Sequence, residues 1–198
     1  MAKLYLQRHL KSQWNLENKF TGWTDVPLSE EGIKSAPEAA KQFAGCRIDK
    51  VYTSPLIRNK ETANLILNEL GKSDLPIIMD KALDERSYGE LQGLNKGEVK
   101  EKYGDEQVRL WRRSYDVAPP GGESLKDVCK RAEPFFRRHI ESDLKDGKSV
   151  LVVASHNSLR AIVKYIENIS DEEIINVELP FGALLKYEFD GGKYTKVA

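Results

Sequence analysis

The sequence has few of the residues that build disulfide frameworks, zinc sites or membrane spans. Its 198 residues include only two cysteines, Cys46 and Cys129, which lie far apart and form no CxxC pair. No apolar run reaches the roughly 18 residues of a membrane span, and residues 1–7 lack the basic and apolar stretches of a signal peptide. Neither sign of charge is in excess, with 31 basic and 31 acidic side chains. We therefore predict a cytoplasmic protein that binds neither nucleic acid nor a membrane.

The distribution of apolar residues predicts one α/β domain over residues 1–198. There is no repeat, low-complexity tract or break in composition, and 40% of the residues are apolar. Strand-like runs are expected at residues 3–8, 49–53, 75–80, 149–154 and 183–189. The run at 149–154 is apolar throughout, as in a strand buried on both faces. With helical segments between the strands, we expect a three-layer α/β/α sandwich around a mostly parallel sheet.

Serine and proline residues predict where several helices begin and bend. Ser54 followed by Pro55 is typical of a helix start, and Ser158 follows the buried strand as the start of another helix. Pro37 is expected to interrupt the helix that Ser29 caps, and Pro134 to bend a long helix over residues 123–145.

Reactive side chains follow four of the predicted strands at the point where each strand ends. Arg8 and His9 follow the first strand, and Arg58 lies just after the second. Glu85, beside Asp84 and Arg86, follows the third strand, and His156 follows the fourth together with Asn157. Because ligands of open α/β sheets bind at the carboxyl ends of the strands, one crevice could collect these side chains.

This set of side chains suits phosphoryl transfer without a metal. Arginine guanidinium groups and a protonated histidine can stabilise the charge of a transferring phosphoryl group. A histidine nitrogen can attack phosphorus and form a phosphohistidine, and a glutamate can move the proton of a substrate hydroxyl. No carboxylate cluster suited to Mg²⁺ is evident in the sequence.

From the residues alone, structural explanations stay open. A single histidine at the end of a strand is more often structural than catalytic, and His139 is expected on a solvated helix face. The basic run of Arg109, Arg112 and Arg113 around Trp111 could be a solvated face or a nucleic-acid patch.

Nine short motifs resemble those of the cofactor-dependent phosphoglycerate mutases, within the histidine phosphatase superfamily, and they occur in that family's order. The motifs span residues 8–9, 12–15, 20–29, 53–58, 84–89, 91–96, 102–106, 111–113 and 157–161. The first motif is typical of the superfamily. The Thr-Gly-Trp, Leu-Gln-Gly-Leu-Asn-Lys and Trp-Arg-Arg motifs are much more specific to the mutases.

The resemblance implies a role for each matching residue. His9 would carry the phosphoryl group, Glu85 would act as acid and base, and Arg8, Arg58 and His156 would surround the phosphorus. The residues implied to bind phosphate and substrate are Ser12, Asn15, Thr21, Gly22, Tyr88, Lys96, Arg112, Arg113 and Asn157. The resemblance further implies interconversion of 2- and 3-phosphoglycerate in glycolysis and gluconeogenesis, priming by 2,3-bisphosphoglycerate and no metal. A homo-oligomer is compatible with it.

The chain departs from the family pattern beside both histidines. Leu10 and Lys11 stand where the family has glycine and usually glutamate, so we expect a reshaped and more cationic pocket. The loop at His156 is one residue shorter; an ungapped alignment puts Ser155 in the place of the histidine, but we expect His156 to reach the phosphate. The alternative functions are a phosphatase of small phosphate esters and a catalytically weakened binder of phosphorylated ligands.

Overall fold

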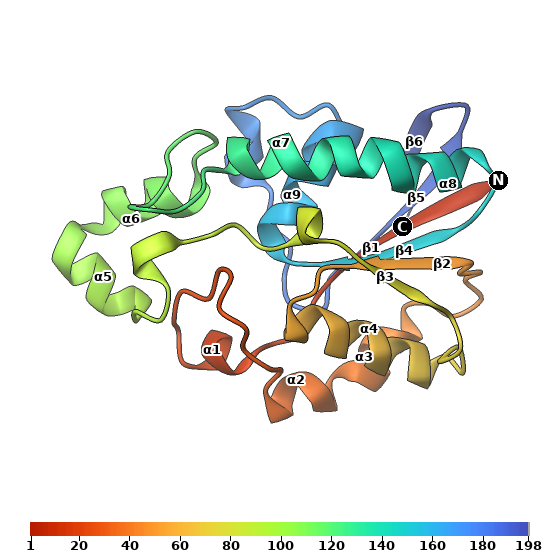
Figure 1. Ribbon diagram of the computed structural model, residues 1–198, viewed down its shortest axis with the longest axis horizontal. Helices are drawn as coiled ribbons and strands as arrows, with labels where there is room; N and C mark the ends of the chain where they lie inside the picture. Colours follow the sequence, from red (N-terminus) through yellow and green to blue (C-terminus); the bar gives the residue numbers. More distant parts are fainter. Residues whose placement is uncertain (198) are drawn as a thin grey trace.

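A six-stranded sheet runs through the centre of the molecule (Figure 1). The computed structural model describes residues 1–197. The strands are β1 (Ala2–Arg8), β2 (Lys50–Thr53), β3 (Ile77–Met79), β4 (Val150–Ala154), β5 (Leu184–Asp190) and β6 (Lys193–Val197). Their order is β3-β2-β4-β1-β5-β6, in which β3, β2, β4 and β1 are parallel and β5 and β6 join antiparallel. The prediction of a mostly parallel α/β sheet is confirmed.

Helices cover both faces of the sheet. The α-helices are α1 (Gln13–Leu16), α2 (Glu30–Lys34), α3 (Ala36–Lys41), α4 (Ile57–Glu69), α5 (Lys96–Tyr103), α6 (Asp105–Arg113), α7 (Leu125–Phe135), α8 (Glu141–Lys145) and α9 (His156–Ile166). Short 3-10 helices lie at η1 (Lys81–Leu83), η2 (Gly89–Leu91) and η4 (Glu173–Asn176), and η3 (Phe136–Ile140) is a π-helix. Helices α2 to α4 lie on one side of the sheet and α7 to α9 on the other (Figure 1). None of the helices within residues 1–197 has the length and apolar character needed to cross a bilayer.

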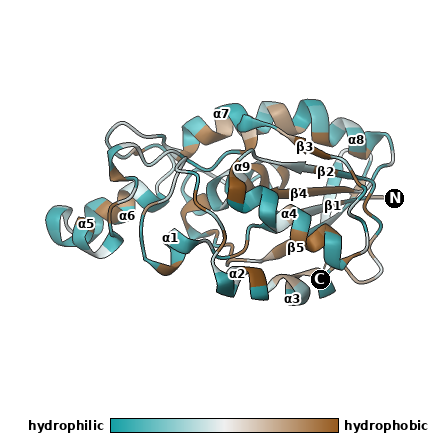
Figure 2. Cartoon of the chain, turned by 60° about the horizontal axis from the view of Figure 1, so that its bottom comes forward, coloured by the Kyte–Doolittle hydropathy of each residue, from teal (hydrophilic) through white to brown (hydrophobic). Residues whose placement is uncertain are grey.

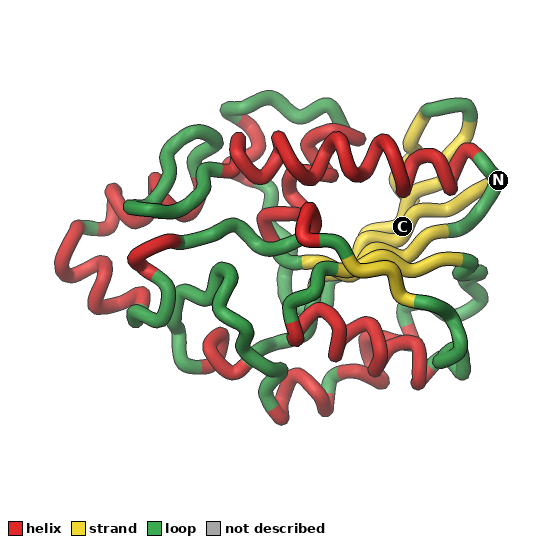
Figure 3. The backbone as a smooth tube through the Cα atoms, in the orientation of Figure 1, coloured by secondary structure: helices red, strands yellow, loops and turns green. Residues whose placement is uncertain are grey.

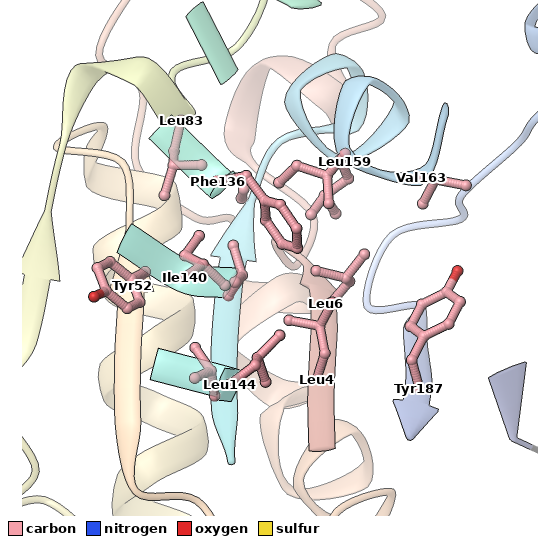
Figure 4. Packing of buried hydrophobic residues seen from close by; sticks show 14 of the residues in the cluster. Leu4, Leu6, Tyr52, Leu83, Phe136, Ile140, Leu144, Leu159, Val163 and Tyr187 are labelled. Atoms are coloured by element: carbon pink, nitrogen blue, oxygen red, sulfur yellow. The ribbon is translucent and has the colours of Figure 1, made fainter. Parts of the chain in front are cut away.

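The alternation of side chains along the central strands divides the core between the two faces. In β4, Val150 and Val152 pack with the α7 to α9 layer, whereas Leu151 and Val153 pack with α3 and α4. Figure 4 shows the first of these layers, where Leu6 of β1 meets Phe136 and Leu159. Figure 2 shows the hydrophobic strands enclosed by helices whose outer surfaces are largely hydrophilic. The continuous apolar run of β4 is therefore explained by burial on both faces, as predicted.

Two predicted helix starts are wrong by two residues. Helix α4 begins at Ile57 rather than after Ser54, because the Ile57 N–H donates to Asp25 Oδ1 at 2.6 Å and so receives its cap from a distant loop. Ser54 instead accepts a hydrogen bond from the Asn59 side chain at 2.6 Å. Helix α9 begins at His156, directly after β4, rather than at Ser158. His156 therefore lies in the first turn of a helix.

The predicted interruption near Pro37 is observed, whereas Pro134 lies inside a continuous helical segment. The chain breaks at Ser35 between α2 and α3, with Pro37 in the first turn of α3. After Pro134 the long helix widens into the π-helix η3 before it continues as α8.

The carboxyl ends of the parallel strands point toward a part of the molecule without strands. Figure 3 shows the strands gathered at one end, with loops and the helices α1, α5 and α6 at the other. The functional side chains predicted at the strand ends lie between these two parts.

Candidate active site

A pocket of about 280 Å³ lies at the carboxyl ends of β1 and β4. It collects every predicted site residue except Ser12. The predicted residues that line it are Arg8, His9, Asn15, Thr21, Gly22, Arg58, Glu85, Tyr88, Lys96, Arg112, Arg113, His156 and Asn157. These residues come from segments that are far apart in the chain, which is the arrangement expected at the carboxyl edge of an α/β sheet.

Ser12 lies outside the pocket and has a structural role. It is fully buried, and its side chain caps α1 while donating to Asn15 Oδ1 at 2.8 Å. This contact holds the Asn15 side chain, which does line the pocket. Ser12 thus positions a pocket residue instead of lining the pocket itself.

His9 is held as a neutral imidazole with a defined proton. It follows β1, is buried, and its Nδ1 lies 2.6 Å from the carbonyl oxygen of Leu10. A carbonyl only accepts hydrogen bonds, so Nδ1 carries the proton and Nε2 keeps its lone pair. Burial, followed by the charges of Arg58 and Arg8, lowers the pKa of His9 well below its usual value. The ring is therefore neutral and nucleophilic at physiological pH.

Two buried arginines beside His9 are held by backbone carbonyl groups. Arg58, in the first turn of α4, donates to the carbonyl oxygens of Gly22 at 2.7 Å and Thr24 at 3.1 Å. Arg8, the last residue of β1, donates to the carbonyl oxygen of Leu179. Carbonyl partners orient the guanidinium groups without neutralising them, so both keep their positive charge for a ligand.

The carboxylate of Glu85 is ionised and rigidly held. Its Oε1 accepts hydrogen bonds from the backbone N–H groups of Arg86 at 2.7 Å and Asn157 at 3.1 Å. Burial raises the pKa of Glu85, but His156, the Arg86 N–H and Arg58 outweigh this effect, so the pKa is lowered overall. Asn157 lies in the first turn of α9, where a helix favours negative charge. Glu85 can therefore accept a proton at this position.

His156 reaches the pocket despite the shorter loop. It is the first residue of α9 and lines the pocket, whereas Ser155 is fully buried and contacts Asn59. The expectation of a protonated histidine is wrong here, because burial, ahead of the opposing contact with Glu178, lowers the pKa of His156 to about 4. The positive charge of the site therefore comes from its arginines and lysines.

The far end of the pocket is built on α5 and α6. Lys96 is the first residue of α5, and Arg112 and Arg113 end α6, which two buried arginines hold in place. Arg86 donates to the carbonyl oxygen of Arg112 at 2.8 Å, and Arg160 donates to that of Arg113 at 3.2 Å. The basic run is thus a pocket wall, and only its exposed member Arg109 fits the solvated-face interpretation.

Leu10 and Lys11 do not reshape the pocket as expected. The Leu10 side chain is buried in the core layer formed with α3 and α4, beneath His9. Lys11 pairs with Glu31 at 3.1 Å. Neither residue lines the pocket, because Leu10 turns into the core and Lys11 is directed to Glu31.

The sequence reasoning missed several residues that line the pocket: Asn18, Lys19, Phe20, Glu178 and Phe181. Asn18 to Phe20 lie in or beside the third matching motif, and this proximity was the signal in the sequence that could have placed them in the pocket. Glu178 and Phe181 lie just before β5, an antiparallel strand whose preceding loop reaches this edge of the sheet. No signal in the sequence alone separated them from an ordinary loop.

Several buried polar atoms in the pocket have no hydrogen-bond partner within residues 1–197. They are Arg8 Nε, Thr21 Oγ1 and Arg58 Nε, and His156 Nε2 also makes no hydrogen bond although Glu178 Oε2 lies 3.5 Å from it. Buried polar groups are almost always paired, so a cluster of orphaned groups indicates a ligand with several acceptor oxygens. A phosphate group fits this requirement. Over the same residues, no group of three or more histidine, cysteine or acidic side chains is placed to hold a metal ion.

Comparison with known proteins agrees with this geometry. The sequence profile of the histidine phosphatase superfamily (branch 1) matches residues 4–198. A 2,3-bisphosphoglycerate-dependent phosphoglycerate mutase of Cytophaga hutchinsonii is 49% identical, covering 96% of this chain and 88% of that protein. A protein of the same name from Treponema denticola is 46% identical over 95% of this chain and 87% of its own. The fold matches a mycobacterial glucosyl-3-phosphoglycerate phosphatase with a TM-score of 0.88 and 22% identity, covering 100% of this chain and 98% of that one.

Proposed function

This chain belongs to branch 1 of the histidine phosphatase superfamily, and we propose that it interconverts 3-phosphoglycerate and 2-phosphoglycerate through a phosphohistidine at His9. The observation that carries the proposal is the neutral, Nδ1-protonated ring of His9 beside Arg8 and Arg58. Such a ring presents an unprotonated Nε2 to phosphorus in a cationic pocket. 2,3-Bisphosphoglycerate supplies the phosphoryl group that loads the histidine.

The guanidinium groups around His9 stabilise the phosphoryl group during transfer. As the bond between His9 Nε2 and phosphorus forms and the bond from phosphorus to the departing oxygen breaks, negative charge spreads over the phosphoryl oxygens. Arg8, Arg58 and Thr21 line the pocket, and their side chains can donate hydrogen bonds to these oxygens. Because backbone carbonyls already orient the two guanidinium groups, little reorganisation is needed.

Glu85 accepts and returns the proton of the phosphoglycerate hydroxyl. When a hydroxyl of phosphoglycerate attacks the phosphohistidine, its proton passes to the ionised Glu85 carboxylate. In the reverse direction the protonated Glu85 returns that proton to the departing oxygen. Arg112, Arg113 and Lys96 hold the carboxylate and second phosphate at the other end. Attack by the 2-hydroxyl of 3-phosphoglycerate gives 2,3-bisphosphoglycerate and free His9. This bisphosphate reorients and passes its 3-phosphoryl group to His9 Nε2, which releases 2-phosphoglycerate.

The ratio of isomerisation to hydrolysis tests this proposal. We expect 3-phosphoglycerate to be isomerised rapidly only when 2,3-bisphosphoglycerate is present, with little release of inorganic phosphate. Intact-mass analysis should show a phosphoryl adduct that His9→Ala loses. His139→Ala, which changes an exposed histidine, should retain the adduct. Phosphate release without isomerisation would identify a phosphatase, and the absence of any adduct would leave only a binding protein.

A further inference from the structure

A carboxylate of the protein itself occupies the far end of the cationic pocket. Glu178 Oε1 pairs with Nη1 of Arg113, and its Oε2 lies 3.5 Å from Nε2 of His156. The two oxygens of one side chain therefore contact a residue at the distal end and a residue beside the phosphorus position. A substrate with an anionic group at each end would seek the same two partners.

The backbone beside Glu178 is anchored, but its side chain can leave. Leu179 accepts the hydrogen bond from Arg8 and is buried, and the Phe181 ring lies 3.8 Å from the Arg8 guanidinium carbon. The Glu178 side chain is 55% exposed, so solvent can receive the carboxylate when another anion displaces it. The anchored backbone keeps it near the pocket in either position.

Glu178 neutralises one part of the distal end and leaves the rest free. Among residues 1–197, no carboxylate lies within ion-pair distance of Lys96 or Arg112. The contact with His156, together with the charge of Arg113, lowers the pKa of Glu178 to about 2. Its carboxylate is therefore an anion at neutral pH.

We infer that Glu178 is a specificity-determining residue, because its carboxylate occupies the place of an anionic group of the ligand. It lowers the affinity of the pocket for anionic ligands, and this effect grows with the negative charge of the ligand. The inference rests on the proposed function, because it concerns the same pocket and phosphoglycerate ligands. A ligand must displace the carboxylate from Arg113 or bind beside it, and either case costs more for an additional phosphate group. The residue would thus limit binding of the bisphosphate relative to the monophosphate.

Binding calorimetry on charge-removing variants tests the inference. His9→Asn in every protein prevents phosphoryl transfer, so the heat reports binding alone. In this background we expect Glu178→Gln to lower the dissociation constant of 3-phosphoglycerate about tenfold and that of 2,3-bisphosphoglycerate about a hundredfold. Glu188→Gln is the matched control, because Glu188 lies on β5 in a partly exposed pair with Lys3 and its change alters the net charge equally. It should leave both dissociation constants unchanged.

Three results would overturn the inference: unchanged affinities, weaker binding, or equal tightening of both ligands in Glu178→Gln. Weaker binding would mean that Glu178 positions His156 and Arg113 for the ligand. Glu178→Ala, which removes the side chain, should give the same ranking and serves if the glutamine variant folds poorly. Failure of the proposed function is separate, since it would appear as an absence of isomerisation in the protein with both His9 and Glu178 intact.

Discussion

The protonation states of the pocket side chains determine how the site works at the scale of single residues. His9 and His156 are neutral because both rings are buried, and nearby positive charges lower their pKa values further. Glu85 is ionised, because the backbone N–H groups of Arg86 and Asn157 and the charge of Arg58 stabilise its carboxylate although it is buried. A neutral nucleophile and an ionised base are the two forms that the first transfer step requires.

Acid should destabilise the protein through His156. The unfolded chain binds this proton near pH 6.5 and the folded chain only near pH 4, so the free energy of unfolding falls as the pH drops between these values. The difference corresponds to about 3 kcal/mol. Urea unfolding at pH 7 and pH 4 should show that wild type loses about this much more stability than His156→Gln. The exposed His139 provides the control, and His139→Gln should lose as much as wild type. Identical losses in wild type and His156→Gln would contradict the assignment.

At the scale of elements, short loops and helix ends hold the reactive groups in position. The loop at Gly22 approaches the segment at Tyr88 so closely that a Cβ atom on Gly22 would lie 2.1 Å from Gln92 Oε1 and 3.0 Å from the Tyr88 nitrogen. Gln92 Oε1 also accepts the Trp23 N–H at 2.9 Å, so it cannot move without breaking that bond. The Gly22 carbonyl in turn orients Arg58.

Replacing Gly22 should therefore affect both stability and catalysis. Its φ of 56° already disfavours a side chain. Gly22→Ala should lower the free energy of unfolding by about 3 kcal/mol, and it should lower kcat more than tenfold because Arg58 is displaced. Gly71→Ala is the matched control, with a φ of 64° and no atom within 4 Å of the added carbon. Gly71→Ala should lower the free energy of unfolding by about 1 kcal/mol and leave kcat unchanged. Urea unfolding and steady-state kinetics measure both effects, and similar kcat values for the two variants would refute this role of the Gly22 loop.

At the scale of the whole molecule, the pocket lies between the sheet and the part formed by α5 and α6. Arg8 and His9 line it at the strand ends, whereas Lys96 belongs to α5. Burial and the charge of Arg112 lower the pKa of Lys96, which shows how closely the cations of the distal end are gathered. Ligands that span both parts should depend on Lys96, and small phosphate analogues should not.

Thermal shifts distinguish these two kinds of ligand. At about a hundred times its Kd, either 3-phosphoglycerate or vanadate should stabilise wild type by about 2.7 kcal/mol, a rise in Tm of roughly 5–10 °C. Lys96→Ala should lose about half of the shift with 3-phosphoglycerate at the same concentration and keep the shift with vanadate. Lys102→Ala, an exposed position on the same helix, should match wild type with both ligands. An equal loss with both ligands in Lys96→Ala would place Lys96 at the phosphoryl end instead.

Local patterns in the sequence determined the layers of the fold and most of the site. The apolar run of β4, the break near Pro37 and the reactive residues at the strand ends were readable because each depends on nearby residues. The motif order extended this to the residues of α5 and α6. Neighbouring residues alone carry this information, through backbone geometry and the period of side-chain burial.

Only the tertiary structure decided which side chains face the ligand and which charges they carry. Leu10 turns into the core and Glu178 enters the pocket from a loop before β5, although nothing local distinguishes these outcomes. The neutral state of His156 likewise arises from burial among groups distant in the chain. The direction in which a side chain packs and the degree to which it is desolvated depend on all the segments that surround it. The residues next to it in the sequence do not specify those segments.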